Sequence, residues 1–162
     1  MGDITKKDLE LIGHLRKNAR IKVTDLAKKV NIPATTIYEK IRKHEKKGII
    51  LKHVAHVDFE KFGYTINIYF AIRVRHEYKE KLMHYLLSHK NINSLFKIDF
   101  EYDFLGSAYF RDDKQSNAFF ELLYRQFPVL EIVKYHIQQE LMTEELLTNQ
   151  NEEISELTQN NN

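Results

Sequence analysis

Residues 23–50 read VTDLAKKVNIPATTIYEKIRKHEKKGII, a pattern typical of two short helices joined by a tight turn and ended by a glycine. Asn31 stands at the turn, and asparagine tolerates the left-handed backbone conformation that ends many helices. Each half carries apolar residues at helical spacing, so the two helices are expected to pack together as a helix-turn-helix unit. The apolar positions are Leu26, Ala27 and Val30 in the first half, and Ile37 and Ile41 in the second.

Two residues mark the limits of the second helix. Pro33 has a fixed φ and no backbone N–H, which suits the first turn of a helix, and Gly48 is expected to stop the helix. Thr36 with Glu39 offers a competing cap one turn further along, so two starting points stay open. His44 occupies the next helical step of the apolar face.

The opposite face of the second helix carries hydroxyl, guanidinium and ammonium groups, which suit the phosphates and base edges of duplex DNA. A lysine-rich helix by itself is more often a solvated surface. The small residue Ala27, the break at Asn31, the hydroxyl pair at the helix start and the stop at Gly48 together favour nucleic-acid binding. The candidate DNA-binding residues are Ala34, Thr35, Thr36, Tyr38 and Glu39, with Arg42, Lys43 and Lys46 expected on phosphates.

The composition is that of a folded chain with one compact domain or two small ones. It has 162 residues, of which 43% are hydrophobic and 12% aromatic. Because there is no cysteine, disulfides, thiolate metal sites and cysteine nucleophiles are excluded. No apolar run approaches the ~20 residues of a membrane span, and no signal-like region begins the chain. A cytoplasmic protein without a membrane partner is expected.

The charge is divided unevenly along the chain. Residues 1–55 hold 14 Lys and Arg against 6 Asp and Glu, a net charge of +8, whereas residues 56–162 hold 11 against 17, a net charge of −6. Such a division suggests a basic module that meets a polyanion and an acidic module with another task.

The residues on either side of the helix-turn-helix complete an N-terminal domain. Thr5 with Asp8 three residues later can form a capping box at the start of a first helix. The apolar, β-branched run 49–57 predicts a strand, which could be the wing of a winged helix-turn-helix. Residues 58–63 are then expected to act as a hinge.

From residue 64 the hydrophobic period changes to two, which indicates strands. A helical pattern follows at 77–89, and Asp112 with Gln115 can cap another helix. The order β-α-β-β-α-β is the ferredoxin-like arrangement, so the whole chain is expected to be α+β. The expected limits are 3–57 for the winged helix-turn-helix, 64–141 for the βαββαβ domain, and 142–162 for a flexible, acidic, Asn-rich tail.

The two helices of such a domain cover only one face of its sheet. The other face, with Tyr69 and Ala71 among polar residues, needs a partner. A second copy of the chain is the simplest one, which predicts a homo-oligomer, either a dimer or a multiple of dimers.

With both halves considered, the chain resembles the Lrp/AsnC family of transcription regulators over about residues 3–141. This resemblance implies dimers joined through the βαββαβ domain, operators with roughly palindromic half-sites, and often an amino-acid effector. The matching positions are 8–15, Asn18, Ala19, Arg20, Asp25, Leu26, Ala27, Val30, Asn31, Ile32, Ile37, Ile41, Glu45 and 48–50.

The chain departs from the family pattern at three places. Pro33 stands where a serine N-cap is usual, and His44 stands where leucine is usual. The family's effector loop carries a glycine three residues before an aspartate, and here Phe100 replaces that glycine while Asp103 is kept. A side chain at this position removes close backbone approach. The resemblance implies a small-molecule effector near Phe100, Glu101 and Asp103, but these residues predict that amino acids are not sensed.

The alternatives are an enzyme and a protein that only assembles with relatives. The 8 histidines lack the spacing of metal ligands on a helix, and no glycine-rich phosphate loop is present, so no metal, cofactor or catalytic residue is expected. The sirohaem decarboxylases resemble the same two-domain architecture, but they would gather cations and histidines in the second half. An assembly partner without DNA binding would show a damaged recognition helix. Both patterns differ from this sequence.

Overall fold

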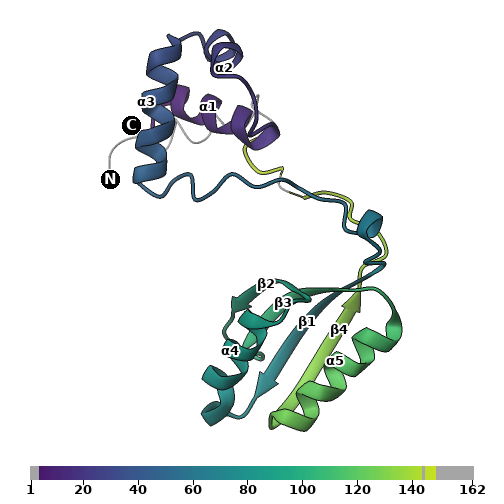
Figure 1. Ribbon diagram of the computed structural model, residues 1–162. Helices are drawn as coiled ribbons and strands as arrows, with labels where there is room; N and C mark the ends of the chain where they lie inside the picture. The colour runs from purple at the N-terminus through teal and green to yellow at the C-terminus, as the bar shows by residue number, and fades with distance from the viewer. Residues whose placement is uncertain (1–3, 144, 149–162) are drawn as a thin grey trace. The chain divides into compact units, whose positions relative to one another are not determined.

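The computed structural model describes residues 4–143 and 145–148, which divide into two compact units. The first unit holds the residues up to His56 together with the segment from Leu141, and the second is Val57–Glu140. Most of the tail expected to be flexible, 142–162, lies outside the described residues. Figure 1 shows helices in the first unit and a sheet covered by helices in the second.

Among its described residues the first unit contains three helices, α1 (Lys6–Lys17), α2 (Val23–Val30) and α3 (Ala34–Lys46). The capping box of Thr5 and Asp8 begins α1, as expected from the sequence. All three helices supply the core because each carries an apolar stripe. Its fully buried members are Leu11, Leu26, Val30 and Ile37.

The turn between α2 and α3 has the predicted geometry. Asn31 has a φ of 55° and ends α2 in the left-handed conformation, and Gly48, with a φ of 68°, follows α3. Pro33 occupies the N-cap position and makes no side-chain cap. The competing cap is not used, because Thr36 already lies inside α3. The helix-turn-helix therefore starts its second helix at the earlier of the two expected positions.

The strand expected at 49–57 is not formed. Residues 51–57 have no regular secondary structure, and the described strands all belong to one sheet in the second unit. A strand needs a neighbour to pair its backbone groups. Here the apolar side chains also lie in solvent, with Leu51 85% and Val54 65% exposed. The β-branched composition was therefore a misleading signal.

A short turn stands where the hinge was expected. Residues Glu60–Phe62 form a 3₁₀ helix that ends at Gly63, whose φ of 80° favours glycine. Phe59 packs on Tyr109 of the sheet, with ring centroids 4.6 Å apart. This turn is thus attached to the second unit.

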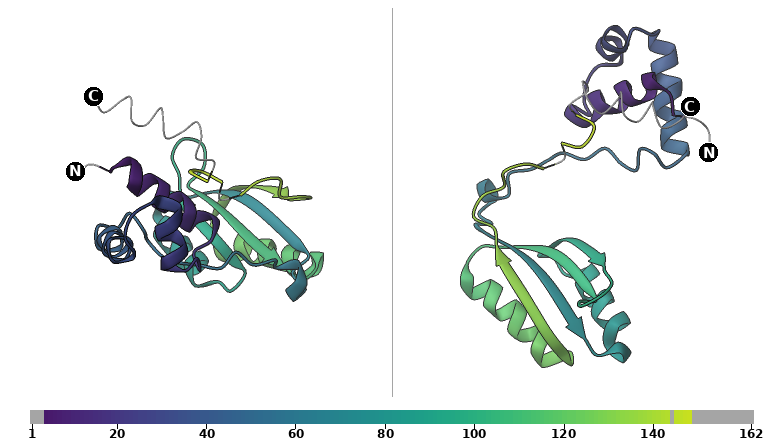
Figure 2. Two further views of the ribbon diagram at one scale, coloured as in Figure 1. Left: turned by 90° about the horizontal axis from the view of Figure 1, so that it is seen from above. Right: turned by 180° about the vertical axis from the view of Figure 1, so that it is seen from behind.

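The second unit is an antiparallel sheet of order β2-β3-β1-β4, with α4 and α5 on one face (Figures 1 and 2). This is the expected ferredoxin-like fold, and Asp112 caps α5 as predicted, accepting from Gln115 N–H at 2.8 Å. The last strand begins at Val129, two residues after Phe127, the C-cap of α5. The elements are β1 (Ile66–Val74), α4 (Lys79–Ser88, after the 3₁₀ turn His76–Tyr78), β2 (Ile92–Lys97), β3 (Phe104–Phe110), α5 (Asp113–Gln126) and β4 (Val129–His136).

The two faces of this sheet differ as the alternation in β1 predicts. Its core-facing residues are Ile68, Phe70, Ile72 and Val74, packed with Leu82, Leu86, Phe119, Phe120 and Leu123 from the helices. On the face without helices Tyr69 lies opposite Tyr135 in the register of β1 and β4. Tyr69 is 42% and Tyr135 59% exposed, whereas Ala71 is buried. This face presents aromatic side chains to solvent.

Candidate nucleic-acid interface

The outer face of α3 carries the residues that the sequence pointed to. Most of them are exposed, and Ala34 and Thr36 are half-buried near the helix start. The residues with hydroxyl groups lie near the start of the helix, and the cations lie in its later turns. The exposed members are Thr35, Tyr38, Glu39, Arg42, Lys43 and Lys46.

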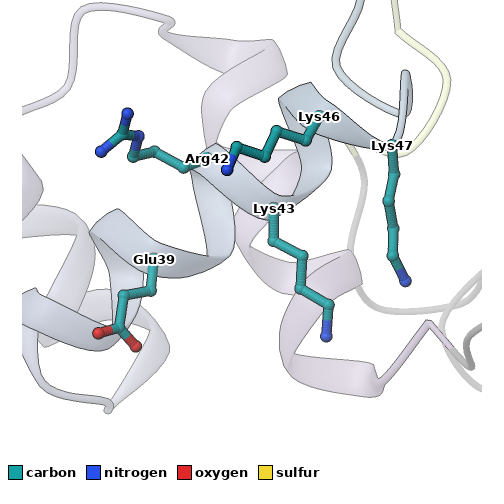
Figure 3. A pocket seen from close by; sticks show the side chains of 5 residues that line it. All are labelled: Glu39, Arg42, Lys43, Lys46 and Lys47. Atoms are coloured by element: carbon teal, nitrogen blue, oxygen red, sulfur yellow. The ribbon is translucent and has the colours of Figure 1, made fainter.

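The cations gather around a shallow pocket at the C-terminal half of α3 (Figure 3). Four of the five lining residues are cations and only Glu39 is acidic, so the surface is strongly positive and suits a polyanion. Lys47, the residue that follows the helix, was missed by the sequence reasoning, because the apolar period used to place site residues ends with α3. The lining residues are Glu39, Arg42, Lys43, Lys46 and Lys47.

One contact orders the middle of this face. The Arg42 guanidinium carbon lies 5.6 Å from the centroid of the Tyr38 ring, one helical turn earlier. A cation over an aromatic face at an exposed site is worth about 0.5–1 kcal/mol. The contact therefore limits where the guanidinium group can point without using its hydrogen-bond donors.

The inner side of α3 contains an ionic cluster that the sequence reasoning did not identify. Asp8 Oδ1 lies 2.7 Å from Lys40 Nζ and 3.0 Å from His44 Nε2. Burial opposes ionisation of Asp8, but hydrogen bonds from Lys40, Thr5 and His44 together hold the pKa of its carboxyl group well below the ordinary value. Lys40 and His44 lie one helical turn apart on the same side of α3, but that spacing does not identify Asp8 as their partner.

The candidate effector residues lie on the connection between β2 and β3. Phe100 has a φ of 71°, a left-handed conformation that favours glycine, and its side chain is 100% exposed. Glu101 is exposed as well. The Phe100 ring therefore points into solvent, while its backbone keeps the conformation of a glycine position.

Asp103, the third of these residues, is engaged by its own chain. Its Oδ2 accepts from Val74 N–H at 2.9 Å, and its Oδ1 lies 2.5 Å from Lys79 Nζ. Burial raises the pKa of the Asp103 carboxyl group. The hydrogen bonds from Lys79 and from the Val74 N–H outweigh this effect, so the pKa lies below its ordinary value. The cation beside it is Lys79 of α4, whereas Arg111 lies over the Tyr64 ring.

Two features are absent from the part of the chain that the structure describes. In residues 4–143 and 145–148 no group of three or more His, Asp or Glu side chains is placed to hold a metal ion. None of the described helices combines the length and the apolar character needed to cross a bilayer.

Comparison with known sequences identifies relatives along most of the chain. Residues 4–50 match the family described as winged helix-turn-helix DNA-binding. An uncharacterised HTH-type transcriptional regulator of Pyrococcus horikoshii is 31% identical over 130 residues, 78% of this chain and 84% of that protein. A similarly named regulator of Pyrococcus abyssi is 32% identical over 122 residues, 74% of this chain and 79% of that protein.

Solved structures share the fold of this chain. A transcriptional regulator from Neisseria meningitidis in complex with L-Met has a TM-score of 0.81 at 17% identity, covering 87% of this chain and 94% of that chain. LrpC of Bacillus subtilis has a TM-score of 0.75 at 21% identity, covering 88% and 99%. These similarities show that the fold extends through both units.

Proposed function

Because the chain belongs to the Lrp/AsnC family of DNA-binding transcription regulators, we propose that it reads its sites through α3. In this proposal base edges are contacted from the first half of the helix and phosphates from the second half. The base-contacting residues are Ala34, Thr35, Thr36, Tyr38 and Glu39, and the phosphate-contacting residues are Arg42, Lys43 and Lys46.

The observation that carries this assignment is the division of α3 into two sides. Ile37 is fully buried on the inner side, whereas Tyr38 is 55% exposed on the outer side beside the cation cluster. A helix that enters the major groove needs such an outer face, with short polar side chains for bases and long cationic ones for the backbone. In this proposal the protein binds DNA without catalysing a reaction, and it acts in the cytoplasm.

The test is to map the sites that the protein occupies across its genome. We expect a limited set of discrete sites that share a roughly palindromic sequence, because two copies related by symmetry read two half-sites. Titration of one such site should show affinity that falls steeply with salt. Uniform occupation of the genome, with no shared sequence, would contradict sequence-specific binding through α3.

We further propose that residues 64–141 serve for assembly, while 3–57 bind DNA and 58–63 join the two. The support is the sheet face without helices, where Tyr69 and Tyr135 lie side by side and exposed. Burying such an aromatic surface against a second copy lowers the free energy, because apolar area is removed from water. The net charge of the second half, being negative, does not suit nucleic acid.

Replacing Tyr69 and Tyr135 together by lysine is expected to reduce the assembly to single chains. Sedimentation of the unchanged protein at micromolar concentration should give at least twice the 19.4 kDa mass of one chain. The double variant places like charges on both copies and should approach that mass. Tyr124→Lys, at a 53% exposed position of α5, is the control. A monomeric unchanged protein would refute assembly through this face.

The remaining proposal is that the protein does not sense the common amino acids. Its support is that both oxygens of Asp103 are engaged, one by Lys79 and one by the Val74 N–H. A ligand ammonium group would have to displace Lys79, and a ligand carboxylate would meet Glu101 nearby. The Neisseria regulator in complex with L-Met makes methionine one ligand to include in the test.

We expect no common amino acid at millimolar concentration to shift the melting temperature or the assembly state. Linkage makes this a sensitive measurement, since a ligand at 100 times its Kd stabilises the native state by about 2.7 kcal/mol. A clear upward shift with one amino acid, lost in Asp103→Asn, would show that the loop is an effector site after all.

A further inference from the structure

The inner side of α3 changes character along its length. Ile37, in the first half, is fully buried among apolar side chains of α1 and α2. One turn later Ile41 is only half-buried, and the next inner residue is His44, which is 4% exposed and contacts Asp8. Lys40 contacts the same oxygen of Asp8. The half of α3 that carries the proposed phosphate contacts is therefore held by one carboxylate in addition to the packing of Ile41 against the apolar core.

That carboxylate belongs to the first turn of α1, and its second oxygen is used as well. Asp8 Oδ2 accepts from the Thr5 N–H at 2.9 Å and from the Thr5 hydroxyl at 2.7 Å. The neighbouring Lys7 donates through Nζ to the carbonyl oxygen of Val30 at 2.7 Å, which fastens the same turn to the end of α2. The first turn of α1 thus holds both helices of the helix-turn-helix.

The His44 side chain is placed by its contact with Asp8. A carboxylate only accepts hydrogen bonds, so the proton is assigned to Nε2. The other ring nitrogen, Nδ1, is buried and has no hydrogen-bond partner among the described residues. Burying an unpaired nitrogen costs free energy that an apolar side chain at this position would not cost. The contact of His44 Nε2 with Asp8 is therefore the polar interaction that favours the imidazole here.

We propose that Asp8 is a positioning residue that holds α3 at the angle at which its side chains read base edges. This inference rests on the proposed function of α3. Base contacts require placement within about half an ångström, whereas long cationic side chains reach phosphates from a range of positions. Loss of the Asp8 charge therefore lowers discrimination between sequences more than it lowers attraction to DNA in general.

The test compares Asp8→Asn with Asp25→Asn in the full chain. Asp25 lies in the first turn of α2 and is exposed. Both aspartates belong to the first unit, so each variant loses one negative charge from that unit. The probes are a duplex enriched by the unchanged protein from a random pool and a scrambled duplex of equal length and composition. Asp8→Asn is expected to lower the ratio of the two affinities about tenfold, roughly the loss of one good base contact. Asp25→Asn should leave the ratio unchanged.

Two further variants separate positioning from simple loss of folding. Asp8→Glu keeps the charge and places the usual capping-box residue at this position, so it should retain the ratio of the unchanged protein. Lys40→Met removes the ammonium partner and leaves the Thr5 cap intact, and it should lower the ratio as Asp8→Asn does. This second loss can be measured even when Asp8→Asn does not fold.

Partial unfolding gives a different result, because it lowers both affinities by one factor and leaves their ratio constant. A constant ratio in Lys40→Met, and in Asp8→Asn where it folds, would overturn the positioning role. Failure of the unchanged protein to enrich any sequence would overturn the proposed function of α3, and the positioning role with it.

Discussion

Replacing Arg42 and Lys43 together by alanine is expected to weaken binding to every duplex and to reduce its salt dependence. Each neutralised phosphate releases condensed counterions and contributes about 0.9 to the slope of log affinity against log salt concentration. Two lost phosphate contacts should therefore lower the magnitude of the slope by about 2. Both side chains lie at the cation cluster of α3, so the loss should be similar for enriched and scrambled sequences.

The matched control for this experiment is the double replacement of Lys90 and Lys114 by alanine. Both lysines are exposed in the second unit, so the net charge changes equally while α3 stays intact. Titrations at several salt concentrations should give this control nearly the slope of the unchanged protein. An equal slope in the Arg42 and Lys43 variant would remove these two residues from the phosphate contacts.

Ile37→Ala is expected to unfold the first unit and abolish DNA binding. Truncating a fully buried isoleucine costs about 2–5 kcal/mol, from lost burial and from the cavity left behind. Ile37 is one of four fully buried apolar residues in the core of this unit, the others being Leu11, Leu26 and Val30. Small domains have little stability to lose.

Hydrogen exchange on the full chain can measure this loss separately for each unit. Amides of α1 to α3 should exchange rapidly in Ile37→Ala, while those of β1 and β3 stay protected by their separate core. Leu51→Ala deletes a side chain that is 85% exposed and should change stability by less than about 0.5 kcal/mol. Unchanged protection in α1 to α3 would show that this core tolerates the cavity.

Local patterns in the sequence were sufficient for the helices, their caps and the strands of the second unit. The left-handed turn at Asn31, the stop at Gly48, the capping box of α1 and the Asp112 N-cap of α5 follow from neighbours a few residues apart. The alternation through β1 likewise identified the buried face of the sheet. Such features depend on backbone geometry and side-chain period, which act within one or two turns of chain. The roles of individual residues of α3 in reading DNA stay a prediction.

Two features depended on the tertiary structure, namely the absence of a strand at 51–57 and the ionic contacts. Residues 51–57 have strand-forming composition but no strand, because pairing is supplied by a neighbour and not by propensity. Asp8 looked like a helix cap, and only folding brought Lys40, 32 positions later, and His44, 36 positions later, to its other oxygen.

The sequence by itself determined the two-part α+β architecture, the helix-turn-helix and its outward polar face, because periodicity and turn chemistry are local. Only the tertiary structure decided which charges are engaged. Asp103 is held by Lys79 of α4, and Asp8 joins α1 to the recognition helix. An ion pair depends on the distance between two side chains in the folded chain, and that distance carries no signature in either residue's neighbours.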